Sequence, residues 1–332
     1  MSNNVAREVT PQLWHTASRY GYLVASIRKL GPGDVDDVVR RIVRQLADDA
    51  ARNPFVNPEI SAPLLADALR ESTSSTWVAI ENRTIVGHLY GALLQSEPYG
   101  IGVWIGPDGV SYESTEVLSD LYAEAGQEWI DAGAREHYAW VLDDASSTGP
   151  WYELGFARMH LRGVLALDQR HAHRLPDGYT LRRGSMDDLD VAVELTTLID
   201  RAQVAGPSFS LDLSTESQRD ELAETLSDPE VNYFLVEHDG EAVGQCITFP
   251  LPPRRGSFDD TLHLSAVVVR EQHQGRGVAT AMVDAALIDA RSKGFEFVET
   301  NWRVTNRRAQ RYWLTYGFHP TYVRLHRTIG AR

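Results

Sequence analysis

The chain has 332 residues, of which 43% are hydrophobic and 23% are charged, and its formal net charge is −14 at pH 7. At roughly 150 residues per domain this length predicts two domains, and the ordinary composition excludes disordered, collagen-like and coiled-coil proteins. An acidic protein repels polyanions, which argues against a nucleic-acid partner and against a polybasic membrane-surface protein.

The remaining global features favour a cytoplasmic protein without a metal. No run of 18 apolar residues is present, and Met1 is not followed by a basic segment and an apolar block, so we expect no membrane partner. The single cysteine, Cys246, excludes an internal disulfide and a cysteine-rich metal site, and its apolar neighbours indicate a buried small hydrophobe.

The chain repeats itself once, in the same order of segments. Trp77–Ile80 and the following Ile85–Gly87 are echoed by Phe234–Glu237 and Ala242–Gly244, and Trp151-Tyr152-Glu153-Leu154-Gly155-Phe156 is echoed by Trp313-Leu314-Thr315-Tyr316-Gly317-Phe318. Such a repeat predicts two copies of one unit; two unrelated α/β halves with similar turns are the alternative. The expected segments are an N-terminal extension (1–26), a first domain (27–167), a linker (168–178) and a second domain (179–332).

Each half reads as a strand, helices, a hairpin, and then strand, helix, strand, helix and strand. Asp239-Gly240 is the clearest two-residue hairpin turn, and Gly294 and Gly317 end helices. The pattern predicts an α/β (α+β) fold. In the second half the elements are expected at 179–183, 187–203, 231–238, 241–250, 262–269, 278–293, 295–300, 307–316 and 321–328. His171 and His173 of the linker are interpreted as solvated rather than metal-binding.

A glycine-rich turn after a β-branched strand is the most informative segment. Val267, Val268 and Val269 end the strand, and the turn and first helical residues are Gln274, Gly275, Arg276, Gly277, Val278, Ala279 and Thr280. The N–H groups at a helix start lack partners and bind anions, typically phosphate, while glycines allow a ligand to approach the backbone. Taken alone, the pattern fits a purely structural turn equally well.

Two motifs resemble one family. Gln274-x-x-Gly277-x-Ala279 resembles the pyrophosphate-binding motif Gln/Arg-x-x-Gly-x-Gly/Ala of the GCN5-related N-acetyltransferases (GNAT). Asn306-x-x-Ala309-x-x-Tyr312-Trp313-x-x-x-Gly317-Phe318 is similar to the second motif of that family. The resemblance covers 179–332 and, through the repeat, more weakly 27–167. It implies two tandem GNAT-like domains, each a mixed, mostly antiparallel sheet flanked by helices and splayed between its fourth and fifth strands.

The resemblance also implies a co-substrate and a reaction. Acetyl-CoA would enter the splay, with its pantetheine along Val267–Val269, its pyrophosphate on Gln274–Thr280, and Asn306 and Trp313 near its middle. The expected reaction transfers the acetyl group to the primary amine of a small molecule by direct attack in a ternary complex, in a monomer or homodimer. The alternative is a non-catalytic acyl-CoA-binding or regulatory module. Several arginines crowd the two motifs: Arg270, Arg276, Arg303, Arg307, Arg308 and Arg311.

The first half lacks the phosphate turn. Its corresponding segment contains Gly106-Pro107-Asp108-Gly109 and then Glu113-Ser114-Thr115-Glu116, and carboxylates at a helix start repel phosphate. Pro150 stands at the position that matches Tyr312. We therefore expect a degenerate first domain that shapes the substrate cleft or stabilises the second half.

Three residues are candidates for proton transfer. By period two, His263 shares a strand face with Ser265, Val267 and Val269. It is the first candidate base, because histidine ordinarily titrates near neutral pH and some arylalkylamine acetyltransferases of the family carry a histidine there. A surface or core histidine near the strand start is the alternative. Glu299 is the second, with a salt-bridged strand carboxylate as the alternative. The family's usual acid, a tyrosine, is replaced by Trp313, which leaves Tyr312, water or an unassisted thiolate.

Overall fold

The fold is described from a computed structural model over residues 25–96, 100–168, 173–210, 215–252 and 254–330. Most of the expected extension (1–26) and His171 lie outside these residues. The first half contains β1 (Ser26–Lys29), α1 (Val35–Arg52), α2 (Ala62–Glu71), β2 (Thr76–Glu81), β3 (Thr84–Tyr90), β4 (Ala92–Ser96), β5 (Gly100–Ile105), β6 (Val110–Tyr112), α3 (Thr115–Asp131), β7 (Glu136–Leu142), α4 (Ala145–Glu153) and β8 (Ala157–Ala166).

The second half has the same order of helices, with three strands where the first half has the five strands β2 to β6. It contains β9 (Tyr179–Arg183), α5 (Leu189–Val204), α6 (Thr215–Ser227), β10 (Asn232–His238), β11 (Glu241–Pro250), β12 (Thr261–Val269), α7 (Val278–Ser292), β13 (Phe297–Arg303), α8 (Arg307–Tyr316) and β14 (His319–Thr328). The expected α/β (α+β) fold class is confirmed, and each expected element of the second half is present.

The strands form two sheets that do not coincide with the two halves. Strands β1-β2-β3-β6 make a small sheet, and the large sheet has the order β4-β5-β7-β14-β8-β13-β12-β11-β10-β9. Among the strand pairs of the described residues, β5–β7 and β12–β13 are parallel and the others are antiparallel. The sheets are therefore mixed and mostly antiparallel, as expected.

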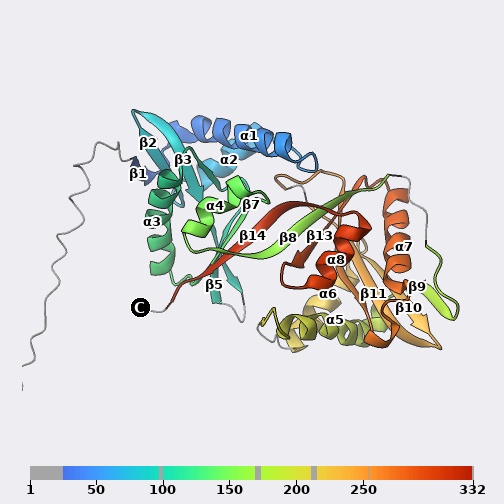
Figure 1. The fold of residues 1–332 in the computed structure, drawn as a ribbon. Coiled ribbons are helices and arrows are strands. Elements are labelled where there is room, and N and C mark those ends of the chain that lie inside the picture. The colour runs from blue at the N-terminus through green and yellow to red at the C-terminus, as the bar shows by residue number, and fades with distance from the viewer. Residues whose placement is uncertain (1–24, 97–99, 169–172, 211–214, 253, 331–332) are drawn as a thin grey trace, which may run out of the picture.

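The two halves exchange their last strands. β14 of the second half pairs with β7 of the first, and β8 of the first half pairs with β13 of the second. In Figure 1 the green β8 and the red β14 run side by side between the two halves. Local periodicity did not predict this arrangement, because it shows where strands are and not which strands pair. The domain boundary expected at residue 167 remains a prediction, and the sheet crosses it.

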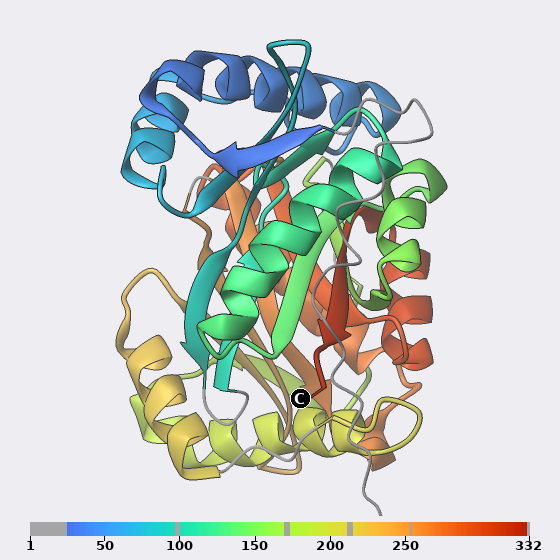
Figure 2. The same ribbon diagram turned by 90° about the vertical axis from the view of Figure 1, so that its left-hand side faces the viewer.

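Helices cover both faces of each half. In the second half α5 packs on β11 and β12, and α7 packs on β10, β11 and β12. In the first half α1 contacts β3 and β6, and α3 contacts β2, β3 and β6. Figure 2 shows α1 and α2 at one end of the molecule and α5 and α6 at the other. One buried apolar cluster includes residues of both halves, from Val103 and Leu161 to Leu264 and Val323, so the two halves share a core.

The contact between strands β8 and β13 leaves no room for a side chain at Gly163. A Cβ placed there would lie 2.4 Å from the Trp302 ring of β13. We therefore expect Gly163→Ala to lower the free energy of unfolding by about 1–3 kcal/mol, the usual cost of overpacking a core. Urea denaturation measures the difference.

Gly149→Ala is the matched control, because a Cβ at Gly149 in α4 meets nothing within 4 Å. It should leave stability unchanged or raise it by up to about 1 kcal/mol, since alanine favours a helix over glycine. Equal stability of Gly163→Ala and the wild type would mean that β8 does not pack against β13 as described.

Candidate cofactor and acyl-transfer site

Strands β12 and β13 separate after a short parallel contact. They pair over Thr261–His263 and Phe297–Glu299, and the Thr300 hydroxyl donates to the Leu264 carbonyl over 2.8 Å at the point of divergence. Beyond it, Val267–Val269 pair with β11 on one edge only. Among the described residues the other edge has no strand partner, so an extended ligand that carries amides can pair with it.

The turn that follows β12 presents open backbone. Gly275 and Gly277 have φ of 73° and 86°, and a Cβ at either would meet nothing within 4 Å. α7 starts directly after Gly277, and no side chain of the described residues caps it. The Gln274 amide donates to the Val269 carbonyl over 2.8 Å and holds the turn on the strand end. The first N–H groups of α7 are thus left for an anion.

The six arginines near the motifs differ in their surroundings. Arg270 is held by Glu194 at 2.8 Å and by the Ala242 carbonyl at 3.0 Å, and Arg303 donates to Gln203 over 2.9 Å. The other four are exposed: Arg276, Arg307, Arg308 and Arg311. The turn and the start of α8 therefore carry exposed positive charge.

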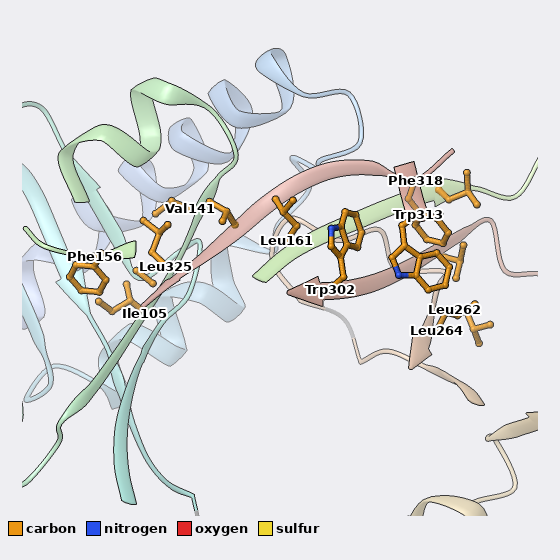
Figure 3. Packing of buried hydrophobic residues seen from close by; sticks show 14 of the residues in the cluster. Ile105, Val141, Phe156, Leu161, Leu262, Leu264, Trp302, Trp313, Phe318 and Leu325 are labelled. Atoms are coloured by element: carbon orange, nitrogen blue, oxygen red, sulfur yellow. The ribbon is translucent and has the colours of Figure 1, made fainter. Parts of the chain in front are cut away.

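Two residues of the second motif, Asn306 and Trp313, stabilise the fold. The Asn306 side chain caps α8 by accepting from the Ala309 N–H over 3.1 Å. Trp313 is 6% exposed, and its ring meets Phe318 edge to face at 5.1 Å. Figure 3 shows Trp313 among Trp302, Phe318 and Leu264. Trp313 is therefore a core residue of the wall between α8 and the sheet.

The Tyr312 hydroxyl and the Cys246 thiol keep their protons at neutral pH. The Tyr312 hydroxyl is buried without a well-formed hydrogen bond to the described residues, and burial raises its pKa far above that of an ordinary tyrosine. Cys246 is buried, as expected from its neighbours, and burial raises the pKa of its thiol to about 12.

His263 does not share a strand face with Val267 and Val269, and this expectation was wrong. The register along β11 changes from Cys246 opposite Val267 to Thr248 opposite Leu264, which places one extra residue in β12. Such a bulge reverses the alternation of side chains. Leu264 therefore joins Val267 and Val269 in the main core, while His263 stacks obliquely on Phe249 at 5.1 Å, on the side covered by α5.

Glu299 is a fully buried carboxylate with several partners. It forms an ion pair with Arg254, accepts from the Ser257 hydroxyl over 3.0 Å, and lies 3.4 Å from Nε of Arg162. Burial favours its neutral form, but the two guanidiniums outweigh burial and hold the pKa of Glu299 below its usual value. Glu299 is thus a salt-bridged strand carboxylate, which was the alternative to a catalytic base.

His263 lies beside this carboxylate, opposite Glu299 in the strand pair. Its Nδ1 is buried without a partner among the described residues, and burial lowers the pKa of His263 to about 4. The imidazole is therefore neutral at pH 7, able to accept a proton and a weaker base than a free histidine. Arg162 was missed by the sequence reasoning, because no local signal places β8 next to β13.

The first half differs at the corresponding helix start. The Ser114 side chain caps α3 by accepting from the Val117 N–H over 3.3 Å. Between β6 and β7 there is a cavity of about 20 Å³, lined by Tyr112, Trp140 and Tyr322 among others, which is room for about one water molecule.

A larger cavity lies where the halves meet. It measures about 430 Å³, within the usual size of ligand pockets. The first half contributes Glu136, Tyr138, Ala157, Arg158 and Met159, and the second contributes Ser208, Phe209, Ser210, Arg303, Thr305, His326 and Thr328. We call it the junction cavity.

In the part of the chain that the structure describes, no three His, Cys, Asp or Glu residues are grouped to hold a metal ion, and no helix is long and apolar enough to cross a membrane. His173, expected to be solvated, is exposed but bonds through Nδ1 to Asp284 of α7 over 2.5 Å.

Comparisons with known proteins assign a family to part of the second half and a fold to both halves. Residues 200–318 match the model of the acetyltransferase (GNAT) family. No curated protein matches the sequence. A GCN5-related N-acetyltransferase from Sphaerobacter thermophilus superposes with a TM-score of 0.65 at 18% identity, over 92% of this chain and 96% of that one.

A second solved structure is a tandem GNAT protein from the clavulanic acid biosynthesis pathway. It superposes with a TM-score of 0.52 at 17% identity, over 93% of this chain and 99% of that one. At these identities the likeness concerns the fold, and it extends over both halves. Residues 200–318 match the GNAT acetyltransferase family, and the chain as a whole carries the GNAT fold in tandem.

Proposed function

We propose that the protein transfers an acetyl group from acetyl-CoA to the primary amine of a small molecule in a ternary complex. The observation that carries the proposal is the uncapped, exposed start of α7 at the mouth of the gap between β12 and β13. A free strand edge can pair with the amides of coenzyme A, and a free helix start can bind its diphosphate.

The residues of the second half fit this co-substrate. The N–H groups of Gly275–Thr280 would hold the diphosphate, with Arg276 and Arg308 adding positive charge, and the edge of Val267–Val269 would pair with the pantetheine. Asn306 lies at the start of α8. Trp313 is buried, and it would shape the site by packing between α8 and the sheet. Acetyl-CoA supplies the activated acyl group as a thioester.

The chain offers weak acids and bases for the proton transfers. His263 is neutral and has a free Nδ1, so it can accept the amine proton directly or through water, but burial makes it a weak base. Glu299 is ionised and committed to two arginines. Tyr312 retains its proton and is a candidate donor to the leaving thiolate. Positioning of the two substrates then supplies much of the rate.

The acceptor amine would approach from the junction cavity. In its wall, Arg303 is the last residue of β13, the strand that also carries Glu299, and Thr305 follows that strand. The remaining wall comes from both halves. In this proposal the first half holds no co-substrate, because Ser114 caps its helix start, and it contributes to the acceptor site instead.

A second candidate is a non-catalytic acyl-CoA-binding module. Trp313, buried where the family commonly has a catalytic tyrosine, favours it. Thiol release from acetyl-CoA in the presence of aminoglycosides, polyamines, amino acids and arylalkylamines separates the two functions. Release that depends on an amine supports the enzyme, whereas tight binding without release supports the module.

Gly277→Asp should strongly weaken acetyl-CoA binding and leave the fold intact. The new carboxylate would stand at the open backbone where a diphosphate meets the helix. Each charge-assisted hydrogen bond that is lost costs about 1.5–3 kcal/mol, so we expect affinity to fall by roughly 100-fold. Calorimetry measures the affinity and circular dichroism the fold.

Gly294→Asp is its matched control. Gly294 follows the other end of α7, also has positive φ (93°), and has nothing within 4 Å of a built Cβ. The two variants share the backbone strain and the added charge, so Gly294→Asp should bind acetyl-CoA like the wild type. If a folded Gly277→Asp also binds normally, the proposed site is wrong.

The pH dependence of kcat/KM should follow the amine and not His263. Since the pKa of His263 is about 4, the imidazole is already neutral from about pH 5 upward and its ionisation adds no limb near 6.5. Two acceptors whose amines differ in pKa should give acid limbs that differ accordingly. The raised pKa of Tyr312 predicts no descending limb below about pH 9. A limb that stays near pH 6.5 for both acceptors would contradict this account.

A further inference from the structure

One member of the buried charge cluster in the second half comes from the first half. The cluster joins Glu299 of β13, Arg254 and Ser257 of the loop before β12, and Arg162 of β8. Glu299 is 0% exposed and Arg162 is 4% exposed. Charges buried this deeply are costly unless they are paired, so each depends on the other.

The strand exchange brings Arg162 to this position. β8 pairs with β13 so that Val164 stands opposite Glu299 and Arg162 opposite Asn301. Residues directly opposite on antiparallel strands share a face, so Arg162 and Glu299 lie on the same side of the sheet. The Arg162 guanidinium lies 4.7 Å from the Trp140 ring of β7 and 5.4 Å from the Tyr322 ring of β14, which cover it.

The first half also fixes the loop that carries Arg254 and Ser257. Asn57 donates from its backbone N–H to the Gly256 carbonyl over 3.3 Å and from Nδ2 to the Ser257 carbonyl over 3.2 Å. Asp108 forms an ion pair with Arg255. Every partner of Glu299 named above is therefore either part of the first half or anchored by it.

His263 stands next to this cluster. The groups whose charges act on it are Glu299 of β13, Arg254 of the loop and Arg162 of β8, and its other close neighbour is Phe249 of β11. One carboxylate and two guanidiniums leave a net positive charge beside the imidazole. Burial is the largest cause of the low pKa of His263; the Glu299 carboxylate acts against it, and the two guanidiniums add to it.

We propose that Arg162 is a positioning residue of the acyl-transfer site, which holds the Glu299 carboxylate in place beside His263, so that the first half completes the site of the second. This inference rests on the proposed function of the second half. The first half thus serves the reaction through a buried charge as well as through the wall of the junction cavity.

A titration of the His263 resonances by NMR in the full chain tests the proposal. Labelled histidine and a His263→Gln variant assign the signal. In the wild type His263 should stay neutral down to about pH 5. Arg162→Gln removes one positive charge and should raise the pKa of His263 by about 1 or more, the scale on which one close charge acts. Arg162→Lys keeps the charge and should restore a value near that of the wild type.

Arg158→Gln is the matched control. Arg158 is also on β8 and forms an ion pair with Asp143 at 2.7 Å, away from Glu299. It should leave the pKa of His263 unchanged. Equal shifts in Arg162→Gln and Arg162→Lys, or no shift in a folded Arg162→Gln, would overturn the proposal.

A second variant keeps the test decisive if Arg162→Gln does not fold. Asp108→Asn frees Arg255 and loosens the loop that carries Arg254, so it should also raise the pKa of His263. An unchanged pKa would contradict the contribution of the first half to the site.

Kinetics on the folded variants should show a lower kcat with an unchanged KM for acetyl-CoA. If no amine is acetylated by the wild type, the proposed function fails, while the NMR shifts still decide whether Arg162 controls His263.

Discussion

The exchange of the last strands is the constraint on which the rest of the structure depends. Strands β7 and β13 each stand beside a gap in their own half, and each would expose an open sheet edge if β14 and β8 did not cover it. Open edges favour pairing with other chains. Because each half closes the sheet of the other, the apolar core is continuous across the halves. The same exchange carries Arg162 to Glu299 and forms the junction cavity.

The two copies of the fold use the same helix start in opposite ways. In the first half the Ser114 side chain accepts from an N–H at the start of α3, and the cavity between β6 and β7 measures about 20 Å³. In the second half Gly277 leaves the start of α7 open, and β12 and β13 diverge. Hydrogen-bond donors that are satisfied by a side chain in the first copy are therefore without a side-chain cap in the second. This asymmetry supports a division of labour, with the co-substrate in one half and acceptor contacts and a buried charge from the other.

Local signals predicted the elements well where the chain carries strong turn residues. The Asp239-Gly240 turn has positive φ at both residues, and it separates two strands close to the expected bounds. Gly317, with φ of 110°, ends α8 at the expected residue. The glycines of the phosphate turn are likewise a local pattern, which is why the candidate co-substrate site was visible in the sequence.

Features that depend on distant contacts were not predictable. The bulge in β12 adds one residue without changing the apolar character of the strand, so strict alternation placed His263 on the wrong face. Arg162 is an ordinary basic residue in an apolar strand until β8 is paired with β13. The burial that lowers the pKa of His263 likewise comes from packing against Phe249 and from the neighbouring strands.

The stoichiometry of acetyl-CoA binding tests the asymmetry of the two halves most directly. A calorimetric titration of the full chain should give a single site per chain, because the start of α7 is open and the start of α3 is capped. Two equivalent sites per chain, or no binding at all, would contradict the account.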